Sequence, residues 1–69
     1  MDAKEIEKRF TYHAPKDGQP QKYEDIRRNA QWFAELLNQL CPESREKSLA
    51  MTALEEAVMW ANASIARNE

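Results

Sequence analysis

The stretch SREKSLAMTALEEAVMWANASIARNE, residues 44–69, carries the apolar repeat that decides the fold. Its main apolar side chains recur at alternating steps of three and four residues, at Met51, Leu54, Val58, Ala61 and Ile65. This spacing is typical of a helix that packs lengthwise against another helix. The repeat therefore predicts a long helix over residues 43–68, which starts either with Pro42 in its first turn or with Ser44 as its N-cap.

A second helical pattern comes directly before this stretch. Apolar residues fall at helical spacings on one face, at Ile26, Ala30, Phe33, Leu37 and Leu40, and Trp32 and Leu36 widen that face. The pattern predicts a helix over residues 21–41, which ends at Cys41 because a residue that precedes proline is pushed out of the helical region. The link to the next helix is short, so the two helices should fold back as an antiparallel hairpin.

The N-terminal part is organised differently. Asp2 can cap a short helix within residues 1–10, and two prolines and the single glycine make residues 11–20 a loop. We therefore expect an all-α protein with a single helical-hairpin domain over residues 1–69.

The size of the chain favours self-association. A domain of 69 residues buries only about 60% of the surface that its unfolded chain exposes. One cysteine, Cys41, and one histidine, His13, exclude an internal disulfide and a Cys/His zinc site. A row of small residues at Ala50, Ala53, Ala57 and Ala61 would let another helix come close. We expect a homo-oligomer that buries the surplus apolar surface of the hairpin.

The net charge of −2 disfavours binding to polymeric DNA or RNA, which usually requires a basic surface. The charge is unevenly distributed, however. Residues 1–28 hold seven lysines and arginines against six acids, and residues 29–69 hold three against six. The N-terminal part can therefore present a cationic surface to a small anion. No apolar run is long enough for a membrane span, and the pattern is that of a soluble protein of a reducing cytoplasm.

No set of residues predicts enzymatic activity. His13 has no cysteine or serine at a spacing typical of a nucleophilic site. Glu55 and Glu56 are adjacent on a helix, so their carboxylates point in different directions. The chain also lacks a glycine-rich phosphate loop and a cluster of metal ligands. We expect no catalytic residue, no metal and no cofactor.

The loop stretch FTYHAPK, residues 10–16, combines two aromatic rings, a histidine, a proline and a cation. An aromatic ring such as Tyr12 in a stiff loop can stack on a base, and the planar guanidinium groups of Arg27 and Arg28 match phosphate oxygens. Both features also have a simpler interpretation, because Tyr12 can anchor the loop and two adjacent arginines can form a solvated helix face. The residues alone leave open a nucleotide-binding protein and a small helical assembly or scaffold protein with no nucleotide ligand.

Three segments carry a resemblance to a known family: EKRFTYHAPK, YEDIRRNA and CPESREKSLAMTALEEAVMWANASIARNE. Together they resemble the phage anti-CBASS proteins, cyclic-nucleotide sponges that blunt bacterial CBASS immunity. Their hairpin domain is shared with a Thoeris anti-defence sponge family. The resemblance covers almost the whole chain, from Glu5 to Glu69.

The resemblance implies a viral protein of immune evasion that acts in the cytoplasm of the infected host. Such a sponge binds cyclic dinucleotides such as 3′,3′-cGAMP, and in some members cyclic trinucleotides, without degrading them. The hairpins of this family interlock into a compact homohexamer, a trimer of dimers, with dinucleotide pockets between protomers.

By the same resemblance, Tyr12 is expected to stack on a base, and Arg27 or Arg28 to meet the phosphates. Arg67 would reach the ligand from a neighbouring subunit.

Two further sets of residues are candidate ligand contacts, although no family motif assigns them. Arg45 and Lys47 are candidates for a trinucleotide pocket near the threefold axis, which needs cations. His13 is a candidate to add a hydrogen bond beside Tyr12.

Overall fold

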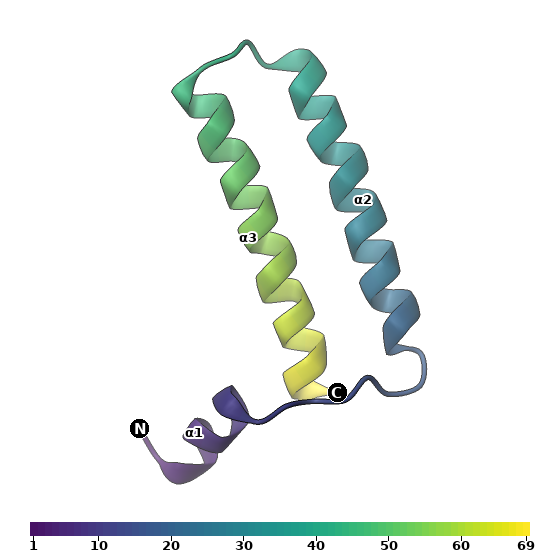
Figure 1. Ribbon diagram of the computed structural model, residues 1–69, viewed down its shortest axis with the longest axis vertical. Helices are drawn as coiled ribbons and strands as arrows, with labels where there is room; N and C mark the ends of the chain where they lie inside the picture. Colours follow the sequence, from purple (N-terminus) through teal and green to yellow (C-terminus); the bar gives the residue numbers. More distant parts are fainter.

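The computed structural model describes residues 1–69 and is all-helical, with three helices and no strands. Helix α1 spans Ala3–Phe10, α2 spans Gln19–Leu40 and α3 spans Arg45–Asn68. Helices α2 and α3 lie side by side and antiparallel, and α1 lies beside the C-terminal end of α3 (Figure 1). The expected all-α class is confirmed. None of the helices is both long enough and apolar enough to cross a membrane.

The N-termini of α1 and α3 are capped by polar side chains, at Asp2 as the sequence predicts and at Ser44, one of the two starts that the sequence left open. An oxygen of the Asp2 carboxylate accepts a hydrogen bond from the backbone N–H of Glu5 at 2.8 Å. The Ser44 hydroxyl oxygen accepts one from the backbone N–H of Lys47 at 3.1 Å. Because Ser44 supplies the cap, α3 begins after it and not at Pro42.

Helix α2 begins two residues earlier than the sequence predicts. Gly18 precedes it with a φ of 83°, which lies in the left-handed region that glycine adopts without a steric penalty. Pro20 lies in the first turn, where its missing N–H would have no helical partner in any case. Pro20, which suggested a loop in the sequence, therefore lies in the first turn of α2.

The contact between α2 and α3 uses the predicted face of α3 but a partly different face of α2. Every residue of the repeat in α3 is half-buried: Met51, Leu54, Val58, Ala61 and Ile65. On α2 the half-buried residues include Tyr23 and Ala34, whereas Phe33 and Leu40 remain 45% and 71% exposed. The side chains of Phe33 and Leu40 therefore point away from the contact between the helices. They are accessible to a further partner.

The chain has no hydrophobic residue that is fully buried. Its accessible surface is 5750 Å², against about 4,500 Å² for a compact monomer of this mass. Its radius of gyration is 15.4 Å, against about 11 Å for a compact chain of this length. Large apolar side chains are exposed on all three helices and on either side of α1: Met1, Ile6, Phe10, Tyr12, Trp32, Phe33, Leu40, Leu49, Met59 and Trp60. These values describe a flat, open hairpin that has no buried hydrophobic core of its own.

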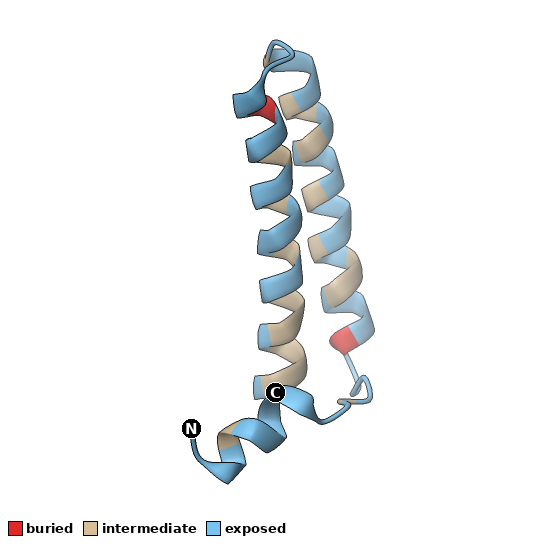
Figure 2. Ribbon diagram, turned by 60° about the vertical axis from the view of Figure 1, so that its left-hand side comes forward, coloured by how far each residue is buried: buried red, intermediate tan, exposed pale blue.

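The only two buried residues are polar and lie at opposite ends of the hairpin (Figure 2). Lys47 is 8% exposed, and its Nζ donates to the carbonyl oxygen of Asn38 at 3.2 Å and also to the carboxylate of Glu43. Gln19 is 3% exposed and donates from Nε2 to the carbonyl oxygen of Ile65 at 3.4 Å. Each residue thus ties one helix to the end of the other.

The substitution Lys47→Met tests the tie at the closed end. It keeps the apolar stem but leaves the Asn38 carbonyl without its donor, so the free energy of unfolding should fall by about 1–2 kcal/mol. Chemical denaturation at a fixed protein concentration measures this.

The matched control is Glu43→Gln. The Glu43 side chain is 90% exposed, so loss of its charge should change stability by no more than about 0.5 kcal/mol. Equal losses in the two variants would instead assign the stabilisation to the ion pair.

Candidate functional site

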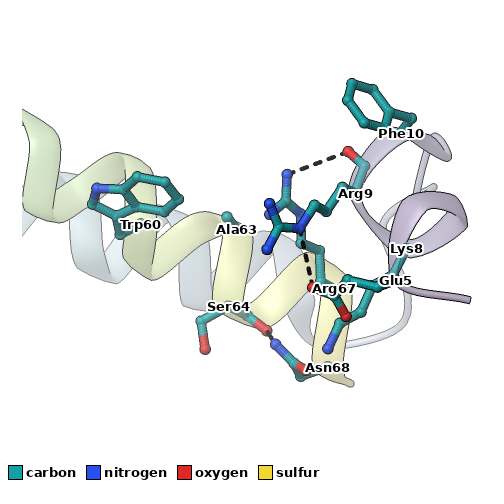
Figure 3. Close-up of a pocket in the computed structure, with 9 residues that line it drawn as sticks. All are labelled: Glu5, Lys8, Arg9, Phe10, Trp60, Ala63, Ser64, Arg67 and Asn68. Atoms are coloured by element: carbon teal, nitrogen blue, oxygen red, sulfur yellow. Dashed lines mark hydrogen bonds and ion pairs between the residues drawn. The ribbon is translucent and has the colours of Figure 1, made fainter. Parts of the chain in front are cut away.

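A hollow of about 560 Å³ lies between α1 and the last turns of α3 (Figure 3). We call it the basic hollow. Nine residues line it: Glu5, Lys8, Arg9, Phe10, Trp60, Ala63, Ser64, Arg67 and Asn68. It exists because the short α1 lies against the end of the hairpin instead of extending away from it.

Cations outnumber acids in the basic hollow. Arg67 donates from Nη2 to the carbonyl oxygen of Arg9 at 3.4 Å, which joins α3 to α1. Arg9 donates from Nε to the Glu5 carboxylate at 3.0 Å. With Lys8, three cations line the hollow against the one carboxylate of Glu5. In a chain of net charge −2, this local excess of positive charge suits an anionic ligand.

Aromatic rings form the other walls of the basic hollow. Trp60 is 64% exposed and Phe10 is 83% exposed. The Trp60 Nε1 donates to the Glu56 carboxylate at 3.2 Å, one turn earlier on α3, which restrains the ring. A restrained, accessible indole beside cations is suited to stack on a planar base.

The loop residues predicted for the site lie next to the hollow but do not line it. Tyr12 is 84% exposed and is not among the lining residues of its own chain. His13 is half-buried, and its Nε2 lies 3.3 Å from the carbonyl oxygen of Lys8, to which a protonated Nε2 donates. His13 therefore holds the loop against α1, and the ring of Tyr12 projects freely from that loop.

Arg27 and Arg28 lie on α2, where they form ion pairs with acids of the same helix. Arg27 binds the Glu24 carboxylate, and Arg28 lies 3.7 Å from Glu24 and 3.9 Å from Asp25. The hydrogen bond from Arg27, followed by its charge, lowers the pKa of Glu24 below the ordinary value. Both arginines are about two-thirds exposed, at 66% and 67%. Such exposed pairs contribute little to stability, so a phosphate can compete for the guanidinium groups.

Arg45 and Lys47 lie at the opposite end of the hairpin. The stretch of α3 from Arg45 to Arg67 is about 33 Å long at the helical rise per residue. Arg45 is exposed, whereas the ammonium group of Lys47 is buried against Asn38 and Glu43. The predicted site residues of a single chain thus lie in three places: the end of the hairpin beside α1, the side of α2, and the first turn of α3.

Sequence reasoning missed Arg9 and Trp60 as residues of the hollow. One signal was available, because Trp60 precedes Arg67 by two helical turns and so lies on the same face of α3. The position of Arg9 depends on how α1 folds back, which no local pattern reveals.

The last turn of α3, which carries Arg67, is held by a polar clamp. Glu69 accepts hydrogen bonds from Lys22 Nζ and, at 3.5 Å, from Gln19 Nε2. Its carbonyl oxygen accepts a further hydrogen bond from Lys16 Nζ. The bond from Lys22 is the main cause that lowers the pKa of Glu69 below its ordinary value of 4.5, and partial burial opposes it.

The depressed pKa gives the clamp a defined pH dependence. A carboxyl whose pKa is lower in the folded state stabilises that state above its unfolded pKa and loses this effect as the pH falls through the folded pKa. The clamp should therefore weaken on acidification below about pH 4.5.

Lys22→Gln should raise the pKa of Glu69, because it removes the main hydrogen-bond donor to this carboxylate. An NMR titration of the side-chain carboxyl carbon measures this pKa. Lys4→Gln, on α1, is the control, and an unchanged pKa in Lys22→Gln would contradict the clamp.

No group of three or more His, Cys, Asp or Glu side chains is placed to hold a metal ion. The chemistry that the described groups offer is the binding of an anion with planar, aromatic parts.

Comparisons with known proteins add the family. The family model described as "Acb2/Tad1, hairpin domain" matches residues 1–66. No curated protein and no solved structure gave a significant match. The family match confirms the resemblance to the anti-CBASS and anti-Thoeris sponges, and this family implies a phage anti-defence sponge.

Proposed function

The chain belongs to the Acb2/Tad1 hairpin-domain family, and from this membership we propose that it sequesters cyclic oligonucleotide second messengers during phage infection. Its ligands are cyclic dinucleotides such as 3′,3′-cGAMP, together with cyclic trinucleotides. Binding in the cytoplasm of the infected host keeps the free messenger below the level that activates CBASS effectors.

The observation that carries this proposal is the basic hollow. Three cations and the ring of Trp60 surround it, in a chain whose net charge is −2. Cyclic dinucleotides present two phosphates and two planar bases, and both kinds of group have suitable partners here. A polymer-binding protein would instead carry an extended basic face.

The proposal requires binding and no reaction. A sponge lowers the free messenger concentration by mass action, so it needs tight sites in high number and no catalytic group. A small chain that assembles into a homohexamer, a trimer of dimers, supplies several sites for little protein mass. Its open hairpin, with ten large apolar side chains exposed, supports assembly.

The dinucleotide site is proposed to lie between protomers. Tyr12 stacks on a base, Arg27 or Arg28 meets a phosphate, and Arg67 reaches the ligand from the neighbouring subunit. Two facts support this division. Tyr12 does not line the hollow of its own chain, and its ring is 84% exposed and free to enter another. His13 then acts through its bond to Lys8, which positions the loop that carries Tyr12.

The trinucleotide pocket is proposed to lie at the other end of the hairpin, where Arg45 and Lys47 would gather around a threefold axis. Arg45 is exposed and can reach a phosphate directly. Lys47 is occupied by Asn38 and Glu43, so its main contribution would be to shape the loop beside Arg45.

Isothermal titration with 3′,3′-cGAMP, followed by heating and chromatography of the released ligand, tests the proposed function. A sponge gives a saturable isotherm and returns intact ligand. The absence of heat with this ligand and with a cyclic triadenylate would favour the alternative, a helical assembly protein that binds no nucleotide.

Tyr12→Ala should lose dinucleotide binding in the same titration, because a base stacked on an aromatic ring is worth about 1–3 kcal/mol. Tyr12→Phe keeps the ring and should retain most of the affinity. Light scattering should give the wild-type mass for both variants. Normal binding by Tyr12→Ala would show that the loop is not the base-stacking element.

Ala57→Phe tests the link between assembly and binding. Ala57 is exposed on α3 within the row of alanines, and a phenyl ring there should prevent the close approach of a second helix. We expect a smaller particle by light scattering and no dinucleotide binding, whereas Ala57→Ser should behave like wild type. An unaltered mass for Ala57→Phe would contradict the role of this row.

A further inference from the structure

The basic hollow contains two groups that the proposed site does not yet use, namely the guanidinium group of Arg9 and the indole ring of Trp60. We propose that both are ligand-binding residues, with Trp60 as the stacking surface for one purine base and Arg9 as a phosphate contact beside Arg67. This inference rests on the proposed function and extends it to residues of α1 and to a second aromatic ring.

The hydrogen bonds of Arg9 leave most of its guanidinium group accessible. The ion pair with Glu5 uses Nε, at 3.0 Å, so both Nη groups remain without a partner in the chain. The carbonyl oxygen of Arg9 meanwhile accepts from Arg67, which brings the two arginines to the same wall of the hollow (Figure 3). Two like charges that line the same hollow, with one carboxylate between the two helices, favour an anion that contacts both.

The surroundings of Trp60 are those of a stacking platform. Its Nε1 is held by Glu56 at 3.2 Å, and the residue is 64% exposed where it lines the same hollow as Arg67. The ring therefore loses little conformational freedom when a base stacks on it. Arg67 lies two helical turns further along the same face of α3, about 10 Å away at the helical rise, so its guanidinium group can meet a phosphate of the same cyclic dinucleotide.

The second ring predicts a preference for cyclic dinucleotides over mononucleotides. Trp60 from one protomer and Tyr12 from its neighbour would hold one base each, with the arginines between them for the phosphates. A mononucleotide such as AMP can engage only one ring. It should therefore bind at least about tenfold more weakly than the cyclic dinucleotide.

The two tryptophans provide a matched pair for the test. Trp32 is 63% exposed and lies on α2, outside the basic hollow. Trp32→Leu leaves Trp60 as the sole tryptophan, so its fluorescence should change saturably as 3′,3′-cGAMP is added. Trp60→Leu should bind this ligand about tenfold or more weakly, while Trp32→Leu should bind normally. Light scattering on both variants reports the assembly.

Arg9 is tested in parallel with a control on the same helix. Arg9→Gln should weaken binding by about tenfold and make it less dependent on salt. Lys4→Gln, which removes a charge of α1 outside the hollow, should leave both the affinity and its salt dependence unchanged.

Each other outcome overturns a defined part of the account. Wild-type affinity in Trp60→Leu and Arg9→Gln would refute this inference and leave the proposed function intact. Loss of binding by Trp60→Leu together with a smaller particle would assign Trp60 to subunit packing. Absence of binding by the wild-type protein would refute the proposed function, and this inference with it.

Discussion

Two helices packed side by side can cover each other along only one face, and this constraint governs the whole molecule. The seam of α2 and α3 leaves every apolar side chain at least partly exposed. The only buried residues are Gln19 and Lys47, which hold the two ends of the hairpin by hydrogen bonds rather than by apolar packing. A chain built in this way has a defined shape but retains apolar surface that other copies can cover.

The same constraint explains why the proposed site residues are dispersed. Tyr12 and Arg67 lie near α1, Arg27 and Arg28 lie along α2, and Arg45 lies at the far end of α3. No single chain brings these groups together, whereas several copies packed through their apolar faces could. The requirement for a larger buried surface and the requirement for a complete ligand site would then be met by one assembly. The polar clamp at Glu69 contributes by fixing the turn of α3 that presents Arg67.

The fold was largely predictable because its signals are local. The repeat in α3, the caps at Asp2 and Ser44 and the break at Cys41 all follow from spacing and side-chain chemistry, and the structure agrees. The face of α2 that contacts α3 was not predictable. Phe33 and Ala34 are neighbours, and only tertiary packing decides which of them faces α3. The site was partly predictable: Arg67 and Trp60 share a helical face, but the place of Arg9 depends on how the loop after α1 sets this helix beside the end of α3.

The central claim is that the ligand site is completed between protomers, and a subunit-mixing titration tests it most directly. Tyr12→Ala and Arg67→Ala chains, each deficient in binding 3′,3′-cGAMP alone, would be unfolded together, reassembled and titrated. If one protomer supplies Tyr12 and its neighbour Arg67, random mixing should restore about a quarter of the wild-type sites. No recovery in assemblies shown by mass spectrometry to contain both variants would contradict a shared site.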